Sequence, residues 1–205
     1  MIINGNLNLA NSTVESLGNL KEIHGSLDLN NCRELISLGK LEKIEVNERK
    51  YMYSLNFSNL PKLKSLGLLK HINWIQRFLI VNCPNLTSLG ELKWFPVNEV
   101  NLQASNIKRI KSYSGFVYTL DLSENKFIQI IEEGVSVGFL NLRNSSIKKI
   151  DKQCTFKILN IENCVNLKSL GRNLRISEKL KIDGSGITEK YLKKYHPELL
   201  KVLEK

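Results

Sequence analysis

An internal repeat constrains this sequence more than any other feature. Two apolar residues that flank one residue, usually a polar one, recur at intervals of 19 to 28 residues along the chain. The first apolar residues of the nine units are Leu7, Leu27, Leu55, Phe78, Val100, Leu120, Leu140, Leu159 and Leu180. Such alternation is typical of a half-buried strand, and strands this short need neighbours to be stable. The sequence therefore predicts short parallel strands stacked into one solenoid with a continuous core.

Two further columns accompany the strands. The tripeptide Ser-Leu-Gly occurs at 16–18, 37–39, 65–67, 88–90 and 169–171. A column three residues after the second apolar position holds Ser12, Cys32, Leu60, Cys83, Ser105, Asn125, Ser145, Cys164 and Ser185. The next apolar residue lies two positions later in the units whose column residue is Ser or Asn. It lies three positions later in the units whose column residue is Cys or Leu. This rule predicts two turn geometries, one with a polar group bonded to turn backbone and one with an apolar group in the core.

Residues 120–130, LDLSENKFIQI, match the pattern LxxLxLxx(N/C)xL, and Cys32, Cys83 and Cys164 fit its cysteine variant. The chain thus resembles the leucine-rich repeat proteins, in the short form of roughly 20–23 residues typical of bacterial, phage and viral members. The resemblance implies an α/β solenoid of about nine units with a parallel sheet on one face. It also implies irregular or short-helical return segments and a ligand surface on the sheet.

The expected organisation is a solenoid over residues 1–187 and a C-terminal helical cap over residues 188–205. Thr188 is the expected N-cap of that helix, and Pro197 is expected to kink or restart it. The expected strands lie near residues 6–10, 26–30, 54–58, 77–81, 99–103, 119–123, 139–143, 158–162 and 179–183.

At the other end, the chain begins inside a repeat. Two alternatives stay open there. Either Met1 to Ile3 cover the first strand poorly, or another molecule covers it, and a homodimer through this end is one form of the second alternative.

Residues that alternate with the core positions face outward on the predicted sheet. These residues are polar and mixed in charge with apolar islands, which suits a protein partner better than a phosphate backbone. The expected partner-binding residues are Asn8, Asp28, Asn56, Arg77, Leu79, Asn101, Asp121, Phe139, Asn141, Arg143 and Asn160. A second interpretation of the Asn and Asp column stays open: these side chains hydrogen-bond up the stack, from one coil to the next, and serve the fold itself.

Two units carry insertions before their strands, and insertions in repeat proteins often bind partners. Their aromatic and basic residues form a second expected surface, made of Arg49, Lys50, Tyr51, Tyr53 and Trp74. The alternative is that the aromatic residues pack the longer loops.

The net charge of +10 is uneven along the chain. Residues 1–100 contain 11 basic and 9 acidic residues, whereas residues 101–205 contain 19 and 11. The alternative function is therefore nucleic-acid binding through the basic second half. Glu132, Glu133, Asp151 and Glu162 interrupt that basic track and count against it.

No enzyme motif is present, and the three histidines are dispersed. We therefore expect a non-enzymatic protein with no catalytic residues, no cofactor and no metal. Cys154 lies outside the cysteine column and is expected to be an ordinary thiol. The chain lacks an apolar run long enough for a membrane span and a signal-like start, so we expect a cytoplasmic protein with no membrane partner. A phage or viral source would direct such a binder at host or defence factors in the host cytoplasm.

Overall fold

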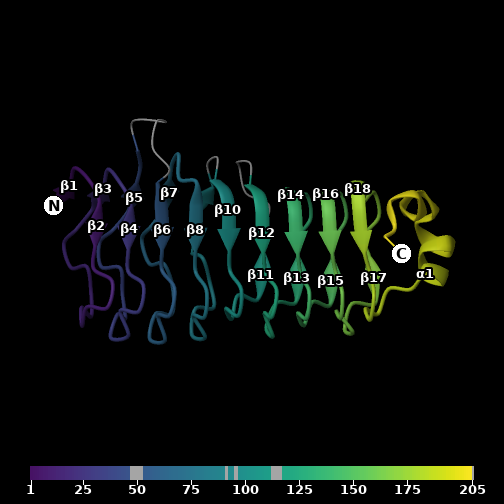
Figure 1. The fold of residues 1–205 in the computed structure, drawn as a ribbon, viewed down its shortest axis with the longest axis horizontal. Helices are drawn as coiled ribbons and strands as arrows, with labels where there is room; N and C mark the ends of the chain where they lie inside the picture. The colour runs from purple at the N-terminus through teal and green to yellow at the C-terminus, as the bar shows by residue number, and fades with distance from the viewer. Residues whose placement is uncertain (47–52, 91, 95–96, 112–116, 205) are drawn as a thin grey trace.

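The computed structural model describes residues 1–46, 53–90, 92–94, 97–111 and 117–204. They form an elongated parallel β-solenoid with the two chain ends at opposite ends of the stack (Figure 1). The predicted solenoid with a parallel sheet on one face is confirmed.

The main sheet runs the length of the solenoid. Within the described residues it has nine strands, ordered from β18 at one edge to β2 at the other. They are β2 (Leu7–Asn8), β4 (Leu27–Asp28), β6 (Ser54–Asn56), β8 (Arg77–Leu79), β10 (Val97–Asn101), β12 (Val117–Asp121), β14 (Ser136–Asn141), β16 (Thr155–Asn160) and β18 (Arg175–Lys181). Equivalent residues pair directly, as in Leu7 with Leu27 and Leu120 with Leu140. The repeat therefore sets the register, because equivalent apolar residues then stack into one core.

The return segments differ from expectation. They were expected to be irregular or short-helical, but they form short strands that stack into two further parallel sheets. In the described first half these strands are β1 (Ile2–Ile3), β3 (Glu22–Ile23), β5 (Lys43–Ile44), β7 (His71–Ile72) and β9 (Lys93–Trp94). In the described second half they are β11 (Arg109–Ile110), β13 (Ile130–Ile131), β15 (Lys149–Ile150) and β17 (Ser169–Leu170). Because the coils stack, backbone N–H and C=O groups of each return strand hydrogen-bond to a neighbouring coil, so they do not need a helix to pair them.

The main strands also have different bounds from those expected. In the second half they begin up to four residues earlier, at Val97, Val117, Ser136, Thr155 and Arg175. They end at the residue between the two apolar positions, because the chain turns immediately afterwards. Two residues after the second apolar position, the backbone is left-handed, with φ between 52° and 67°, at Asn11, Asn31, Asn59, Asn82, Ala104, Glu124, Asn144, Asn163 and Gly184. Asn tolerates this conformation better than most residues, which explains its recurrence there.

The two turn geometries predicted for the position three residues after the second apolar residue are both observed, one at Asn125 and the other at Leu60. The Asn125 side-chain oxygen accepts hydrogen bonds from the backbone N–H groups of Phe127 and Ile128, both at 2.9 Å. Leu60 is fully buried in the core. The cysteines combine both roles, because they are buried and the Cys83 thiol also donates to the Phe57 carbonyl of the preceding coil at 3.0 Å.

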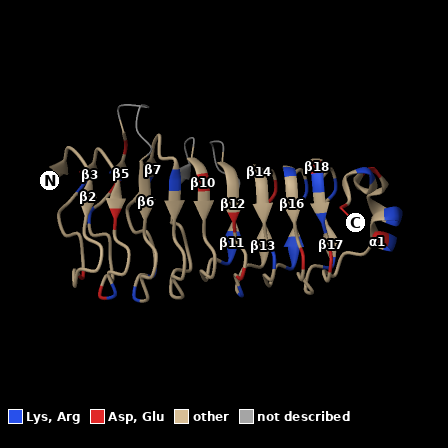
Figure 2. Cartoon of the chain, in the orientation of Figure 1, with Lys and Arg blue, Asp and Glu red and all other residues tan. Residues whose placement is uncertain are grey.

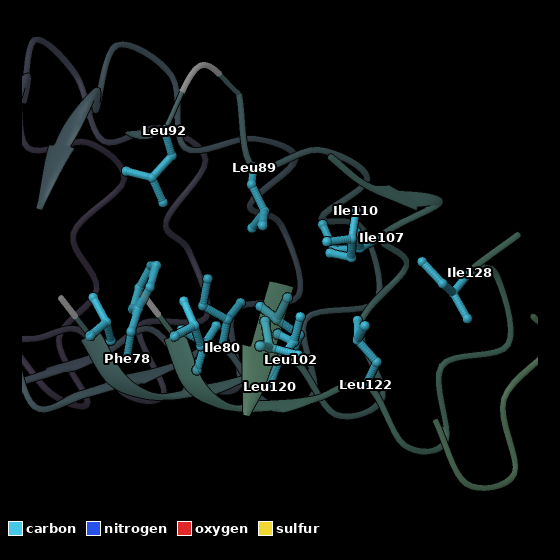
Figure 3. Packing of buried hydrophobic residues seen from close by; sticks show 14 of the residues in the cluster. Phe78, Ile80, Leu89, Leu92, Leu102, Ile107, Ile110, Leu120, Leu122 and Ile128 are labelled. Carbon is cyan, nitrogen blue, oxygen red and sulfur yellow. The ribbon is translucent and has the colours of Figure 1, made fainter. Parts of the chain in front are cut away.

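The core is one continuous cluster along the stack. Side chains from the main sheet, such as Phe78 and Leu120, face side chains from the return segments, such as Leu89 and Ile110, across the core (Figure 3). Phe78 lies edge-on to Phe57, with ring centroids 5.3 Å apart. Apolar residues at fixed positions of each coil thus hold neighbouring coils together.

The C-terminal end of the stack is covered by the predicted helix, α1 (Glu189–Tyr195). Thr188 caps it by accepting a hydrogen bond from the Tyr191 N–H at 3.1 Å. A 3₁₀ helix, η1 (Pro197–Val202), follows with Pro197 at its start, as expected for a restart. Leu192 and Leu199 are buried, so this cap joins the core. The division of the chain into two domains at residue 187 stays a prediction.

At the N-terminal end, β1 and β2 are edge strands of their sheets. Met1 and Ile2 are exposed, and the Met1 carbonyl accepts a hydrogen bond from the Lys21 N–H at 2.8 Å. The homodimer through this end stays a prediction.

Candidate functional site

The expected partner-binding residues lie along the solvent-facing side of the main sheet or at the ends of its strands. Strand register brings them into columns: Asn8 is next to Asp28, Asn101 next to Asp121, and Asn141 next to Asn160. The strands are the longest between β14 and β18, so this face is widest in the second half (Figure 1).

The Asn and Asp column has a structural role throughout the stack. In each case the side-chain oxygen accepts a hydrogen bond from the backbone N–H two residues later, at 2.8 to 3.3 Å. The residues are Asn8, Asp28, Asn56, Asn101, Asp121, Asn141 and Asn160. These bonds close the turn that leads into the left-handed residue. These bonds lie within single coils. Among the described residues of the column, a bond up the stack is seen where the Asn141 side-chain N–H donates to Asp121 at 3.2 Å. A continuous ladder up the stack and a binding role for these residues both stay predictions.

Leu79 departs from this column and forms an apolar island with Val81 on β8 and the turn that follows it. Both side chains are partly exposed. Arg77, at the start of β8, pairs with Glu99 of β10 at 3.4 Å. The island therefore lies beside a charge pair that joins β8 to β10.

A larger apolar area lies across β12, β14 and β16, and we call it the β12–β16 patch. It consists of Tyr118, Gly138, Phe139, Lys157 and Ile158. Phe139 pairs directly with Ile158 on the next strand, and both are partly exposed. Tyr118 is 45% exposed, so part of its side chain faces solvent.

Gly138 allows the Tyr118 ring to lie flat against β14. A Cβ atom at Gly138 would come within 2.7 Å of the Tyr118 carbonyl oxygen and 3.1 Å of the ring. The Lys157 ammonium lies 5.9 Å from the ring centroid and 3.6 Å from the Glu178 carboxylate. The patch thus has an aromatic surface with one cation at its edge.

Sequence reasoning found Phe139 but missed Tyr118, Gly138 and Lys157. These three residues lie in the early part of strands that were expected to begin later. Arg143, also predicted, is exposed just beyond the end of β14, where its N–H donates to Asn141.

The second expected surface is described only in part. Arg49, Lys50 and Tyr51 lie outside the described residues. Tyr53 packs against the core, in agreement with the packing alternative. Trp74 is 41% exposed and has a left-handed backbone with φ of 56°.

Basic residues of the second half lie on the main-sheet strands β16 and β18, on β11, β15 and the segments beside them, and on α1 (Figure 2). Several are already paired with carboxylates. Arg109 pairs with Glu132 at 3.3 Å, and Lys149 pairs with Asp151 at 3.3 Å. The Lys152 ammonium lies 3.4 Å from Glu133. This alternation of charge interrupts the track that a phosphate backbone would follow, and the nucleic-acid function stays a prediction.

The four cysteines are buried and free of disulfides. Burial raises the pKa of Cys83 and of Cys154 to about 11, and raises that of Cys164. Because the thiolate is the reactive form, these thiols are poor nucleophiles at neutral pH. Cys154 is thus a packed thiol, as expected, and donates to the Glu132 carbonyl at 3.3 Å.

Glu22, His24 and Glu45 form one cluster of metal-ligand types in the described part of the chain. The His24 Nε2 lies 3.3 Å from Glu22 and 3.8 Å from Glu45. The Lys43 ammonium already lies 2.6 Å from the same Glu45 oxygen, and this hydrogen bond raises the pKa of Lys43. Glu45 therefore has a cationic partner within the protein, which favours a polar network beside β3 and β5 over a metal site.

Comparison with known families corrects the resemblance inferred from the sequence. Residues 1–98 match the family model of the Receptor L domain, whose members are β-helix solenoids rather than leucine-rich repeats. The leucine-rich repeat assignment is therefore wrong, in agreement with the strands found in the return segments. Receptor L domains typically bind ligands and are not catalytic. No curated protein and no solved structure matches the chain.

Among the described helices, none is long and apolar enough to cross a membrane. The cytoplasmic location stays a prediction.

Proposed function

We propose that this chain is a non-catalytic binding protein that recognises a protein partner through the solvent-facing side of its main sheet, centred on the β12–β16 patch. One observation carries the proposal: Tyr118, Phe139 and Ile158 form a partly exposed apolar area on a sheet face that is otherwise mostly polar, apart from the island of Leu79 and Val81. Exposed apolar area bordered by polar residues is typical of protein interfaces.

The composition of the patch supports a protein as the ligand. Tyr and other large side chains contribute most of the binding energy at interfaces, particularly where they lie near the centre of the contact. The surrounding Arg143, Lys157 and Glu178 supply both signs of charge, as expected for a polar rim. The similarity of residues 1–98 to a family of ligand-binding solenoids supports the same class of function.

The rigidity of the support favours binding. Phe139 and Ile158 are flanked by the buried residues Leu140 and Leu159, which stack in register in the core. A surface that is already ordered loses little conformational entropy when a partner binds. The Asn and Asp turns contribute to this order at the ends of the same strands.

Site-specific photo-crosslinking tests the proposal. A photoreactive phenylalanine derivative replaces Tyr118 or Phe139, and the matched control replaces Phe127, which is 47% exposed on the turn after β12. We expect a protein from the native host to crosslink at the two patch positions and not at Phe127. Crosslinking at Phe127 alone would contradict the proposal.

The purified crosslinked partner then allows an affinity measurement. We expect Phe139→Ser to weaken binding by about tenfold or more, because it removes a central apolar contact. Phe127→Ser should leave the dissociation constant within about twofold, as expected outside a contact. Circular dichroism confirms that both variants fold. A folded Phe139→Ser variant with unchanged affinity would rule out the patch as the interface.

A further inference from the structure

A cavity of about 230 Å³ lies between two successive coils, on the outer side of the return segments. One wall is the Ser-Leu-Gly turn of the fourth unit and the residue before it, 87–90, and the other is the segment around β11. Its lining residues are Thr87, Ser88, Leu89, Gly90, Lys108, Arg109 and Lys111. The cavity is remote from the sheet-face columns described above, because these residues belong to the return side of the coil.

The cavity exists because backbone pairing is interrupted at this step. Elsewhere on this side the coils are joined, as by the Thr87 N–H to the Lys64 carbonyl at 3.2 Å and the Gln129 N–H to the Lys108 carbonyl at 2.8 Å. In the described part of the chain, no backbone hydrogen bond joins residues 87–90 to residues 108–111. β11 is accordingly the edge strand of its sheet, and one row of its backbone groups faces the cavity.

The core holds the two walls in place despite this interruption. Leu89 and Ile110 are buried, and both point into the interior of the solenoid (Figure 3). The residues adjacent to Ile110 in the chain, Arg109 and Lys111, are exposed on the other side of the strand. A strand alternates its side chains between its two faces, so burial of Ile110 directs both cations outward at the cavity.

The chemistry of the lining favours an anion. Lys108, Arg109 and Lys111 supply three cations, and Thr87 and Ser88 supply hydroxyl groups. The Ser88 oxygen accepts the Gly90 N–H at 3.0 Å, which leaves its hydroxyl hydrogen available to a ligand. The Arg109 guanidinium also forms an ion pair with Glu132, at 3.3 Å. No carboxylate is among the described residues that line the cavity.

We propose that this cavity binds a tetrahedral oxyanion, the phosphate or sulfate group of a small ligand. Cations on one wall and hydroxyl groups on the other match an acceptor that offers oxygen atoms in several directions, and hydrogen bonds to charged donors are the stronger ones. The Arg109 N–H lies on the free edge of β11, because the backbone groups of Ile110 pair with β13, and it adds one backbone donor. The proposal is independent of the sheet-face function.

The test is a titration of the full chain with inorganic phosphate and, separately, inorganic sulfate, at constant ionic strength maintained with sodium chloride. Backbone amide resonances in two-dimensional NMR report binding residue by residue. We expect saturable shifts at residues 87–90 and 108–111, and none of that size at residues 118–119 of the sheet face. Tighter binding of one anion identifies the group that the cavity prefers. Linear shifts equal to those caused by chloride would overturn the proposal.

Two matched double variants separate the cavity from general surface charge. Lys108→Gln with Lys111→Gln removes two cavity cations, and we expect phosphate binding to weaken by about tenfold or more. Lys148→Gln with Lys168→Gln removes the same charge from exposed positions on the same outer side but away from the cavity. The control double variant should change the affinity for phosphate by less than about twofold, because salt screens exposed charges that lie away from the cavity. Equal losses in the two variants would show non-specific attraction and overturn the proposal.

Discussion

The two halves of the solenoid place the same apolar columns in differently shaped coils. In the first half, a two-residue strand such as β3 ends at Ile23, the chain bends at Gly25, and the main strand begins at Leu27. In the second half, the equivalent segment is continuous with the main strand, so that β16 runs from Thr155 to Asn160. The main strands have two or three residues before residue 95 and five to seven after it.

In the first two coils, a difference of one residue accompanies this change. Ile23 and Leu27 are four positions apart, as are Ile3 and Leu7, whereas Phe156 and Leu159 are three apart, as are Val137 and Leu140. The extra residue allows a bend, which contains Gly5 and Gly25 in the first two coils. A Cβ atom on Gly25 would lie 2.4 Å from the Gly5 carbonyl oxygen, so this bend requires close backbone contact.

β18 shows a third outcome. Ile176 and Leu180 are four positions apart, and the pairing of β16 with β18 has an irregularity between Phe156 and Ile158. The extra residue here forms a bulge within a continuous strand. The family match ends at residue 98, close to Val97, where the first long strand begins. The similarity to the Receptor L domain therefore covers the bent coils and ends where the continuous strands begin.

The largest expected effect tests whether the two halves share one core. Phe78 in the first half and Phe156 in the second are both buried. We expect Phe78→Ala and Phe156→Ala each to lower the free energy of unfolding by about 3–5 kcal/mol, the usual cost of emptying an aromatic core position. Urea unfolding followed by circular dichroism measures both.

Since the buried cluster is continuous, each variant should shift a single transition. Two separate transitions in either variant would show that the halves unfold independently, as happens when the interface between repeats is weak.

The next largest effect tests the one-residue explanation directly. Insertion of a glycine between Gly138 and Phe139 recreates the spacing of the first half within β14. We expect the N-terminal part of β14 to lose its pairing with β12 and β16, at a cost of about 2–4 kcal/mol if several ladder bonds of about 1 kcal/mol are lost. Urea unfolding gives the cost, and hydrogen exchange should show lost protection at Val137.

Insertion of glycine between Lys152 and Gln153, in the exposed turn after β15, is the control and should leave Val137 protected. If Val137 stays protected in the β14 variant, the strand has absorbed the residue as a bulge, as β18 does. Spacing alone would then not decide between a bend and a continuous strand.

A third prediction compares one buried thiol from each half. Burial raises the pKa of Cys83 and Cys154 from 9.0 to about 11. The folded state holds these protons more tightly than the unfolded state, so the stability they contribute is complete below pH 9 and is lost as the pH rises toward 11. At pH 10.5 each thiol should lower the free energy of unfolding by up to about 2 kcal/mol relative to pH 8.

Unfolding measured at both pH values, in the parent protein and in Cys83→Ala and Cys154→Ala, checks this. Each variant should remove its share of the alkaline loss. Equal pH dependence in the parent and both variants would assign the loss to other titrating groups.

The sequence predicted the parts of the fold that repeat with strong apolar character. The main strand columns, the Asn125 turn and the Thr188 cap all follow from local residue patterns. The return strands could not be predicted in this way, because two residues such as Glu22 and Ile23 carry too little alternation to indicate a strand. They become strands only because equivalent residues of the next coil lie beside them.

The candidate binding surfaces show the same limit. Phe139 was predicted because it belongs to a regular column, whereas Tyr118 and Lys157 were missed because their strands begin earlier than the repeat suggests. The cavity beside β11 depends on the absence of pairing between Ser88 and Arg109, which the repeat itself would not indicate. The sequence therefore predicts features that recur in every coil, such as the apolar columns. It does not predict features that depend on the contact between two particular coils, such as the cavity beside β11.

The smallest expected effect compares ion pairs on the return sheets of the two halves. Lys43 and Glu45 lie 2.6 Å apart with side chains 35% and 19% exposed, whereas Lys149 and Asp151 lie 3.3 Å apart with side chains 53% and 27% exposed. Exposed pairs contribute about 0–1 kcal/mol, and better-ordered pairs lie at the upper end of that range. We therefore expect Lys43→Ala to cost about 0.5–1 kcal/mol and Lys149→Ala less than about 0.5 kcal/mol. Thermal unfolding at low and high salt measures both, and the Lys43 effect should decrease in high salt because ions screen the pair. A larger cost for Lys149→Ala would contradict this ranking, and would mean that the return sheet of the second half depends on its surface charges more than that of the first.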